Sequence, residues 1–339
     1  KMSKDDAELV EFLVRTHLLM STVAQKQDTS DPDVIRAFAE KVGNERRLTA
    51  LYLLTVADIR GTSPKVWNAW KGKLLEDLFH NALRVLGGRA PDAESTVEAR
   101  KRDALRLLAL TAQPYASHQA LWDTLNVSYF MRHEPDDIAW HTRQLSRHVG
   151  TKEPIVRARQ SLLGEGVQVV VYTPDQPDLF ARICGYFDRA GMTILDARIH
   201  TARNGYALDT FQIAHEQLQT HYRELTTLIE NGLPQAIQSQ EPLPAPIKRR
   251  LSRRVRSFPM VPLVSLTPDE KAQNWVLSIS ASDRAGLLYS VARILAEHGL
   301  DVQLAKVSTL GERVEDSFLL QVEHLSNSAK QLQIDKQLI

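Results

Sequence analysis

VQVVVYTPDQPDLFARICGYFDRAGMTILDARIHTARNGYALDTFQIAH, residues 167–215, is the stretch that decides the fold of this chain, because a second version of it follows. The second version, WVLSISASDRAGLLYSVARILAEHGLDVQLAKVSTLGERVEDSFLLQVEH, covers residues 275–324. After one deletion in a turn, the equivalent positions include Asp175 and Asp283, Leu179 and Leu287, Gly191 and Gly299, Ala197 and Ala305, Thr201 and Thr309, Asp209 and Asp316, Phe211 and Phe318. Two copies favour a tandem pair of small domains over a solenoid, which needs at least three repeats.

Each copy predicts the same order of elements. An apolar, partly alternating run that starts at Val167 or Trp275 is typical of a strand. Apolar residues then recur at helical spacing, and Gly191 or Gly299 follows where glycine commonly ends a helix. Two strands joined by a tight turn come next, followed in the first copy by a helix expected over residues 215–230. With a closing strand, each copy is expected to form a ferredoxin-like βαββαβ sandwich.

The turn before the first helix of each copy resembles the motif of ACT domains, a family of regulatory modules that bind amino acids. The second copy keeps the pattern D-x-x-G-L intact in Asp283, Arg284, Ala285, Gly286 and Leu287. The first copy has Asp175, Gln176, Pro177, Asp178 and Leu179, with Asp178 where the family has glycine. A carboxylate there adds charge and blocks close approach to the backbone. The resemblance therefore implies an amino-acid site in both turns, altered in the first.

The chemistry of such a turn suits an amino acid. Backbone N–H groups at the start of a helix favour an α-carboxylate. A carboxylate such as Asp175 or Asp283 is then placed to hold the α-ammonium group. The alternative interpretation is that both aspartates are only helix caps. Their presence in the same arrangement in two copies favours the ligand site.

The composition predicts two or three domains, because 339 residues are too many for one compact core. The 42 Lys+Arg and 41 Asp+Glu residues nearly balance, so the overall charge draws the chain neither to nucleic acid nor to an anionic membrane. No uncharged run approaches the roughly 20 residues of a membrane span, and we expect no signal peptide. The one cysteine, Cys184, fits a reducing cytoplasmic compartment and is expected to be packed rather than nucleophilic.

Residues 1 to about 150 are expected to be entirely helical. Helical periodicity recurs over residues 5–25, 46–59, 61–83, 94–111, 118–126 and 135–149. A Rossmann fold is unsupported, because the sequence has no glycine-rich phosphate loop. The predicted fold class is therefore α + (α+β), an all-helical N-terminal region followed by two ferredoxin-like domains.

Asp58 ends the apolar stretch LYLLTVAD, where a carboxylate is costly to bury without a partner. One explanation is an ion pair with Arg46, Arg47 or a distant base. Arg60 is a poor partner, because positions two apart on a helix do not face each other. The other explanation is that Asp58 binds a metal ion.

HLLMSTVAQKQD, LYLLTVADIRGTSPKVWNAWK and YFMRHEPDDIAWH closely resemble the family of bifunctional uridylyltransferase/uridylyl-removing enzymes. The tandem ACT-like tail resembles the same family, so the resemblance covers essentially the whole chain. It implies that the helical region contains the C-terminal half of an HD-type metal hydrolase domain. The last aspartate of the HD pattern lies in a stretch of this kind, which makes Asp58 the predicted metal ligand and catalytic residue. His17 is a further candidate, as an additional ligand or phosphate contact.

The same resemblance divides the chain into five expected parts. They are the end of the HD-type domain (1–88), a helical connector (89–163), ACT domain 1 (164–246), a basic linker bounded by prolines (247–268) and ACT domain 2 (269–339). By resemblance, the intact enzyme uses Mg²⁺ or Mn²⁺, attaches UMP to the PII nitrogen-signalling protein when L-glutamine is scarce, and removes it when glutamine is plentiful. The expected partners are thus glutamine and PII, with a possible homodimer through the ACT domains and no membrane or nucleic acid.

The sequence departs from the family in the residues of catalysis. It has no His-Asp doublet, and the nucleotidyltransferase signature is absent too. A divalent metal site needs several ligands and cannot depend on one carboxylate. We therefore expect this chain alone to bind without catalysing, and its abrupt start at Lys1 leads us to expect a fragment of a longer protein.

Two other features of the sequence suggest metal binding or nucleic-acid binding. His133, His141 and His148 are seven or eight positions apart and so suit one helical face, but no acids or cysteines cluster with them as metal ligands do. The segment 241–262 carries six basic residues, which suggests nucleic acid or phosphate contact. A linker or a strand shared by the two copies is the preferred interpretation of that segment.

Two alternative functions remain open. The first is a non-catalytic amino-acid-binding ACT regulator that acts through protein or nucleic-acid contacts. The second is the stringent-response alarmone enzymes, which also join an HD domain to ACT but typically carry a single terminal copy. The duplication therefore fits that second alternative poorly.

Overall fold

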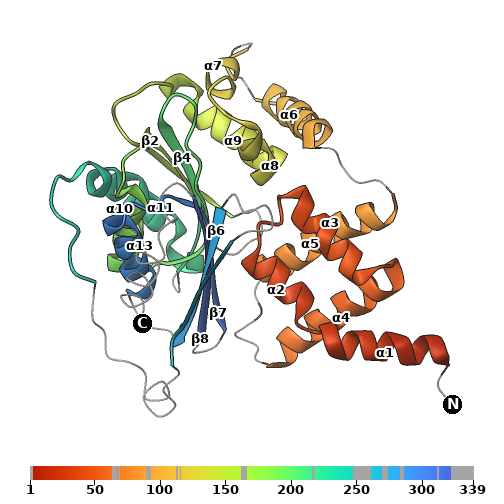
Figure 1. Cartoon of the computed structure of the whole chain (residues 1–339). Helices are drawn as coiled ribbons and strands as arrows, with labels where there is room; N and C mark the ends of the chain where they lie inside the picture. The colour runs from red at the N-terminus through yellow and green to blue at the C-terminus, as the bar shows by residue number, and fades with distance from the viewer. Residues whose placement is uncertain are drawn as a thin grey trace. The chain divides into compact units, whose positions relative to one another are not determined.

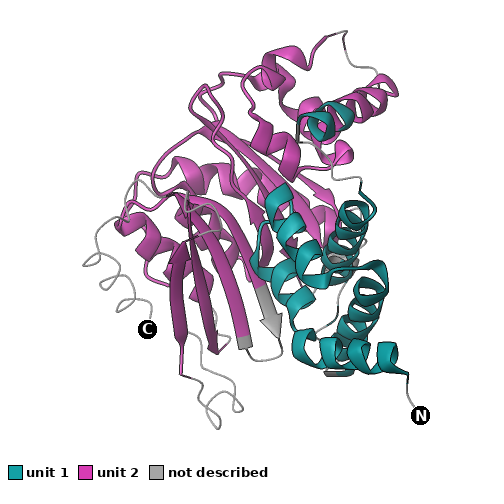
Figure 2. Cartoon of the chain, turned by 45° about the vertical axis from the view of Figure 1, so that its right-hand side comes forward, with its two compact units in different colours: residues 1–99 teal, residues 100–339 magenta. Residues whose placement is uncertain are grey.

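The computed structural model divides into two compact units, residues 1–99 and residues 100–339 (Figure 2). It describes residues 3–62, 67, 69–88, 93–111, 114, 116–161, 166–215, 218–246, 261–268, 274–282, 286–310 and 313–321. Within these ranges, no helix combines the length and the apolar character that crossing a membrane requires.

The first unit is built from α-helices (Figure 1). They are α1 (Lys4–Thr16), α2 (Leu19–Lys26), α3 (Pro32–Val42), α4 (Glu45–Thr62) and α5 (Ala69–Leu86), with α6 (Ala93–Ala109) extending across the boundary between the units. Large apolar side chains from α2, α3, α4 and α5 are fully buried, among them Met20, Phe38, Leu48, Leu51, Leu75 and Leu78. Burial of such side chains is the main term that stabilises a helical unit of this kind.

The helices differ from the sequence-based prediction in two places. Residues 5–25 were expected to form one helix, but His17 ends α1 and α2 begins two residues later. The His17 Nδ1 atom lies 2.9 Å from a carbonyl oxygen of the last turn of α1, where carbonyls lack intrahelical partners. Helix α3 was not predicted, although Asp31 caps it and Pro32 occupies its first turn.

Among its described residues, the second unit contains one antiparallel sheet of eight strands in the order β1-β2-β4-β3-β7-β8-β6-β5. The strands are β1 (Ile155–Gln160), β2 (Val167–Pro174), β3 (Thr193–Arg198), β4 (Tyr206–Ala214), β5 (Leu263–Pro268), β6 (Asn274–Ser282), β7 (Val302–Leu310) and β8 (Arg313–Gln321). The two copies form the two halves of this sheet. They join where β3 pairs with β7, and Ala197 there lies opposite its own counterpart, Ala305.

Helices cover both faces of the sheet. One face packs against α10 (Leu179–Arg189), α11 (Leu218–Gln238) and α13 (Leu287–Glu297). The other face receives α8 (Val127–Arg132) and α9 (Pro135–Leu145), with α7 (Gln119–Trp122) and the short 3-10 helix Ser146–His148 nearby in the chain. Alternation along β4 shows the two faces: Phe211 belongs to the core with α10, whereas Thr210 contacts His133 at the end of α8.

These elements confirm a mixed chain of helices and antiparallel sheet, but the edge strands correct the predicted βαββαβ order. In each half, the strand beside the first strand of the copy precedes it: β1 pairs with β2, and β5 pairs with β6. Strand β1 lies in the segment predicted as a helical connector, and β5 lies in the predicted linker. Strand β1 is mostly half-buried and β5 is mostly exposed, so neither carries a strong apolar pattern, which is why periodicity did not identify them. Residues 322–339, where the closing strand of the second copy was expected, lie outside the described residues.

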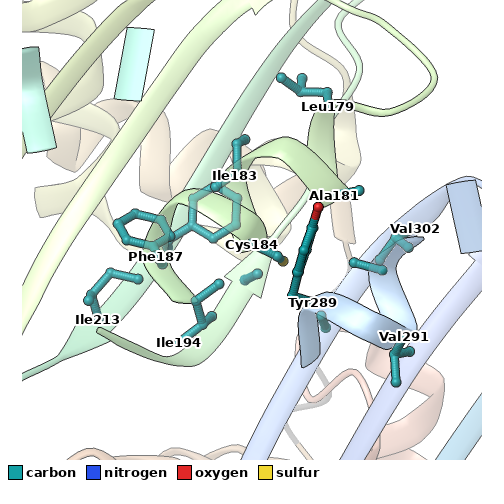
Figure 3. Packing of buried hydrophobic residues seen from close by; sticks show 14 of the residues in the cluster. Leu179, Ala181, Ile183, Cys184, Phe187, Ile194, Ile213, Tyr289, Val291 and Val302 are labelled. Carbon is teal, nitrogen blue, oxygen red and sulfur yellow. The ribbon is translucent and has the colours of Figure 1, made fainter. Parts of the chain in front are cut away.

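The two halves also contact each other through α10 and α13, which lie side by side (Figure 3). Gly185 makes this approach possible, because a Cβ atom at that position would lie 2.8 Å from the Tyr289 ring. The Tyr289 hydroxyl donates a hydrogen bond to the carbonyl of Pro244 at 2.7 Å. One continuous apolar core therefore extends beneath both copies.

Candidate functional site

A cavity of about 440 Å³ lies in the second unit beside the turn that opens α10. The cavity is lined by that turn with the first residues of α10, by residues 199–201 with Asp209 of β4, and by the segment where α13 ends and β7 begins. Gln321 at the end of β8 and the residues at the start of α8 complete the lining. The cavity therefore lies between the two copies and also reaches the helical layer. Its volume is within the roughly 300–1,000 Å³ of small-molecule pockets.

Carboxyl groups form one wall of this cavity, from Asp175, Asp209 and Asp301. Asp175 Oδ2 accepts a hydrogen bond from the Thr201 hydroxyl at 2.8 Å, and Asp209 Oδ1 accepts one from the backbone N–H of His200 at 3.1 Å. Desolvation raises the pKa of Asp175, although part of that residue is exposed. Burial raises the pKa of Asp209 well above its ordinary value, and the charge of Asp175 adds to the effect. Such a wall favours a cationic group, which would relieve the repulsion between the carboxylates.

The first turn of α10 offers the opposite polarity. No carbonyl or side chain among the described residues accepts from the N–H groups of Phe180 and Ala181, and both residues line the cavity. Asp178 precedes the helix but does not cap it; its carboxylate pairs instead with Arg182 at 2.7 Å. The amide groups at this helix start are therefore available to an anionic group, as helix geometry predicts.

The five residues predicted to form the site in the turn of the first copy can now be compared with the lining of the cavity. Asp175, Gln176, Pro177 and Leu179 all line the cavity, whereas Asp178 does not. Gln176 also fixes the turn to α11, because its Nε2 donates to the carbonyl of Ile237 at 3.2 Å. The structure thus brings four of the five predicted residues to one cavity.

The equivalent position in the second copy has a much smaller cavity, about 130 Å³. Gly286 and Leu287 line it, together with residues from the end of α10 and the start of β3. Asp283, Arg284 and Ala285, which complete the predicted motif, lie outside the described residues. Cys184 also lines this cavity; its burial raises the pKa of the thiol well above the usual range, which agrees with a packed side chain.

The residues predicted for metal chemistry lie in the first unit. Asp58 is exposed on α4, so its carboxylate is not the buried charge that the sequence suggested. His17 is exposed as well. Within the ranges that the structure describes, no three His, Cys, Asp or Glu residues group closely enough to hold a metal ion. A Mg²⁺ or Mn²⁺ site therefore does not fit the residues described here, and the metal role of Asp58 stays a prediction.

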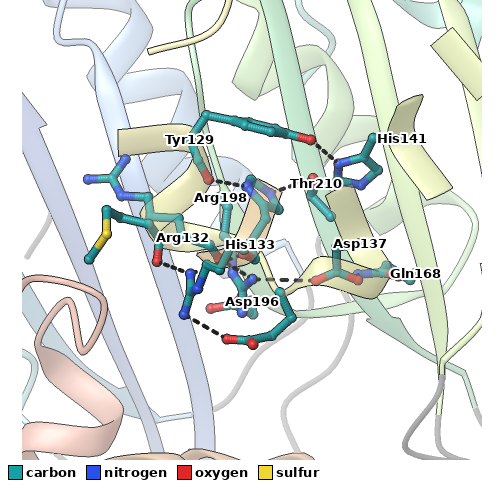
Figure 4. Close-up of polar contacts among 12 residues, drawn as sticks. Tyr129, Arg132, His133, Asp137, His141, Gln168, Asp196, Arg198 and Thr210 are labelled. Carbon is teal, nitrogen blue, oxygen red and sulfur yellow. Dashed lines mark hydrogen bonds and ion pairs between the residues drawn. The ribbon is translucent and has the colours of Figure 1, made fainter. Parts of the chain in front are cut away.

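The histidines of the helical region have a structural role instead (Figure 4). His133 Nδ1 donates to the carbonyl of Tyr129 at 2.9 Å, which leaves Nε2 to accept from the Thr210 hydroxyl at 3.1 Å. The Tyr129 hydroxyl lies 2.8 Å from His141 Nδ1. Burial lowers the pKa of His133 well below its ordinary value and that of His141 to about 3. Both rings are therefore neutral at physiological pH. His148 does not share their site; it lies in the 3-10 helix after α9.

Asp137 holds α9 on the same face of the sheet. Its Oδ1 accepts from Arg159 of β1 at 2.6 Å and from Gln168 of β2 at 2.8 Å. The Arg159 guanidinium also lies over the ring of Trp140 at 4.3 Å. These contacts connect the helical layer to the first copy.

Several residues of the cavity were not identified as site residues from the sequence. Asp209 had a signal, because it aligns with Asp316 between the copies, and both are buried. Asn126, Ser128 and His200 had none, because they come from a helix and a strand end that only folding brings to the turn. The basic residues of the segment 247–260 lie outside the described ranges, so the structure does not test whether they contact nucleic acid or phosphate.

Comparison with known proteins places this arrangement in a family. The family model described as the fifth domain of the uridylyltransferase GlnD matches residues 92–144, which include α6 to α9. A bifunctional uridylyltransferase/uridylyl-removing enzyme of Burkholderia lata is 56% identical over 338 residues. Enzymes of the same name from Burkholderia thailandensis and Burkholderia mallei are 57% identical, over 98% and 99% of this chain.

The chain covers 39% of the length of each of these relatives, so it corresponds to about two fifths of such an enzyme. The matches extend over 98 to 100% of the chain and include both copies of the repeat. With this identity along its whole length, the chain belongs to the family of bifunctional uridylyltransferase/uridylyl-removing enzymes.

Proposed function

We propose that this chain is the glutamine-sensing regulatory part, with a partial HD-type hydrolase domain, of an enzyme that uridylylates and deuridylylates the PII protein. Its similarity to enzymes named for both reactions supports the enzymatic part. The paired copies, joined in one sheet with α10, α11 and α13 packed on the same face, support two ACT domains. The observation that carries the sensing part is the cavity of about 440 Å³ between the copies.

The two polarities of the cavity match the two charges of an amino acid. The α-carboxylate would accept from the N–H groups of Phe180 and Ala181 at the start of α10, whose helix dipole also favours an anion. The α-ammonium group would lie against Asp175 and Asp209. Of the two copies, the first is our proposed glutamine site, because the cavity of the second is smaller than the pockets that usually bind such ligands.

Helix α8 is the element through which binding would reach the helical layer. The Arg132 guanidinium donates to the carbonyl of Gln303 in β7 at 3.1 Å. The Arg198 guanidinium of β3 donates to the carbonyl of Arg132. Helix α8 therefore contacts both copies, and a ligand between them would change its support. This is allostery if two arrangements of the copies bind glutamine with different affinity.

Calorimetric titration of the chain with L-glutamine tests the sensing proposal. We expect saturable binding that L-glutamate and other amino acids do not reproduce. Asp175→Ala should weaken binding, because it removes one of the carboxylates proposed to hold the α-ammonium group. Thermal unfolding should stay close to wild type, because Asp175 is exposed. Absence of saturable heat with wild-type protein would refute glutamine sensing by this chain.

We further propose that the chain alone does not remove UMP from PII. The exposed Asp58 and the lack of a group of metal ligands among the described residues support this. They also favour the alternative function, a non-catalytic amino-acid-binding regulator. A uridylyl-removal assay with uridylylated PII and either Mn²⁺ or Mg²⁺ tests the proposal, and turnover above a no-protein control would overturn it.

A further inference from the structure

Two polar side chains from outside both copies line the large cavity. They are Asn126, the residue before α8, and Ser128, in its first turn. The sequence repeat does not include them, and they belong to the segment that matches the fifth-domain family model. The cavity is thus completed by a third part of the chain.

The orientation of the Asn126 amide is determined by its neighbours. Its Oδ1 accepts from the backbone N–H of Tyr129 at 3.3 Å and from the Ser128 hydroxyl at 2.6 Å. The backbone N–H can only donate, so it requires the amide oxygen rather than the nitrogen at that position, and the Ser128 hydroxyl then donates to the same oxygen. The Nδ2 group, with two N–H donors, has no partner among the described residues.

The hydrogen bond from Ser128 to Asn126 also determines whether the Ser128 hydroxyl can donate to a ligand or accept from it. Its hydroxyl proton is committed to Asn126, so the lone pairs of Oγ remain as acceptors. Together the two side chains present a donor and an acceptor on one wall of the cavity. A carboxamide has the complementary pair, a carbonyl oxygen that accepts and an NH₂ group that donates. A carboxylate has only acceptors, so one of its oxygens would meet the lone pairs of Ser128.

We propose that Asn126 and Ser128 bind the side-chain carboxamide of the ligand and thereby distinguish glutamine from glutamate. This inference builds on the proposed glutamine site and assigns its specificity to the helical layer. The donor of Asn126 binds the ligand carbonyl, and Oγ of Ser128 accepts from the ligand NH₂ group. Selection then comes from hydrogen-bond matching, because glutamine satisfies both the donor and the acceptor whereas a glutamate carboxylate satisfies only the donor.

His200 provides an independent sign that this wall meets a polar ligand. It lines the cavity, is 3% exposed, and its Nε2 atom has no hydrogen-bond partner among the described residues. Burial lowers the pKa of His200 to about 4, so the ring is neutral and has a donor or an acceptor to offer. Unpaired buried polar atoms are uncommon in folded proteins unless a ligand or water satisfies them.

The decisive variant is Asn126→Asp. Aspartate keeps the oxygen that accepts from Tyr129 and Ser128, so α8 retains its cap, but the N–H donors are lost. We expect calorimetry of the whole chain to show glutamine binding weakened about tenfold or more. Asn44→Asp is the matched control. Asn44 also accepts from a backbone N–H at a helix start, that of Arg47 at 2.9 Å, but it lies in the first unit and does not line the cavity.

Ser128→Ala is the second variant, and its exposed side chain makes misfolding improbable as a cause of any effect. We expect it to narrow the ratio of glutamine to glutamate affinity about threefold or more. Unchanged affinity in Asn126→Asp, or an unchanged ratio in Ser128→Ala, would overturn the inference while leaving glutamine sensing intact. If the wild-type chain does not bind glutamine at all, the proposed function itself fails, and the titration of that protein identifies this case.

Discussion

The two copies of the repeat share a fold but differ in the space beside their first helix. The first copy opens onto a cavity of about 440 Å³, and the second onto one of about 130 Å³. Both cavities are built in the same way, from the helix start of one copy and the helix end and following strand of the other. The difference shows that the repeat determines where a site forms, whereas individual side chains determine whether a ligand has room.

One pair of equivalent positions accounts for much of this difference. Ala181 lines the large cavity, and its counterpart, Tyr289, lines the small one. Tyr289 is 2% exposed, so its ring fills space that the first copy leaves open. The second copy therefore gains packing between α10 and α13 where the first copy gains a pocket (Figure 3).

The largest expected effect comes from removing that ring. Tyr289→Ala should destabilise the second unit by about 3–5 kcal/mol, because a buried aromatic side chain is lost and a cavity remains. Denaturant unfolding followed by circular dichroism measures this. Ala190→Gly, at the C-cap of α10, is a control that removes only one partly buried methyl group, and it should cost less than about 1 kcal/mol. A Tyr289→Ala loss no larger than that of the control would contradict the packing role.

The two copies also differ in their contacts with the helices α8 and α9, because Asp137 of α9 forms hydrogen bonds with β1 and β2 in the first half of the sheet. Asp137→Ala should cost about 3 kcal/mol, because it leaves the half-buried Arg159 without its carboxylate. Asp33→Ala is the matched control, since it removes an exposed pair with Arg36 in the first unit. That variant should cost less than about 1 kcal/mol. Equal losses in the two variants would refute a special role for the buried pair.

Acid should weaken the first copy before the second, because His133 contacts Thr210 of β4 and His141 contacts Tyr129 beside it. Their folded-state pKa values lie below the ordinary value, to about 3 for His141, so the unfolded chain binds more protons as pH falls below about 6.5. Their contribution to stability is thus complete at higher pH and is lost on acidification. Between pH 7.5 and 5.5 each histidine should cost about 1.4 kcal/mol.

Hydrogen exchange at the two pH values measures this effect by region. Amides of α8, α9 and β4 should lose protection at the lower pH more than those of β6 and β8. His141→Gln should reduce the pH dependence and keep a polar group beside Tyr129. Equal loss of protection in both halves of the sheet would argue against the histidines as its cause.

The smallest expected effect tests the polar end of the Tyr289 side chain. Tyr289→Phe keeps the ring but removes the hydrogen bond to Pro244, so it should cost about 1 kcal/mol. Thermal unfolding of this variant, measured alongside Tyr289→Ala, separates the contribution of the ring to stability from that of the hydroxyl. A Phe variant as unstable as the Ala variant would mean that the hydroxyl, rather than the packed ring, stabilises the junction.

Much of the second unit was predictable from local patterns. The strands β2 and β4 and the helix α10 lie close to where the apolar pattern placed them, because the strands are buried along nearly their whole length and the helix is buried on one face. The edge strands β1 and β5 were missed, since half-buried and exposed strands carry little apolar signal. Their pairing depends on hydrogen bonds to β2 and β6, which the backbone of any residue can make.

The candidate site was predictable only in part. The turn from Asp175 to Leu179 was found because it is local and because the repeat has it twice. Asn126, Ser128 and His200 were not found, because no sequence spacing relates them to that turn. Asp58 was expected to be buried from its apolar neighbours, but the helix turns its side chain outward and it is exposed.

The sequence by itself determined that the chain carries a duplicated unit, that its first part is helical, and that an acidic turn precedes the first helix of each copy. Only the tertiary structure decided that the two copies share one sheet through β3 and β7. It also decided that residues at the start of α8 line the cavity beside the turn of the first copy, whereas no described α8 residue lines the cavity beside the turn of the second copy. The physical reason is that periodicity records which face of an element is buried, whereas a cavity depends on the shapes of side chains that meet from distant parts of the chain.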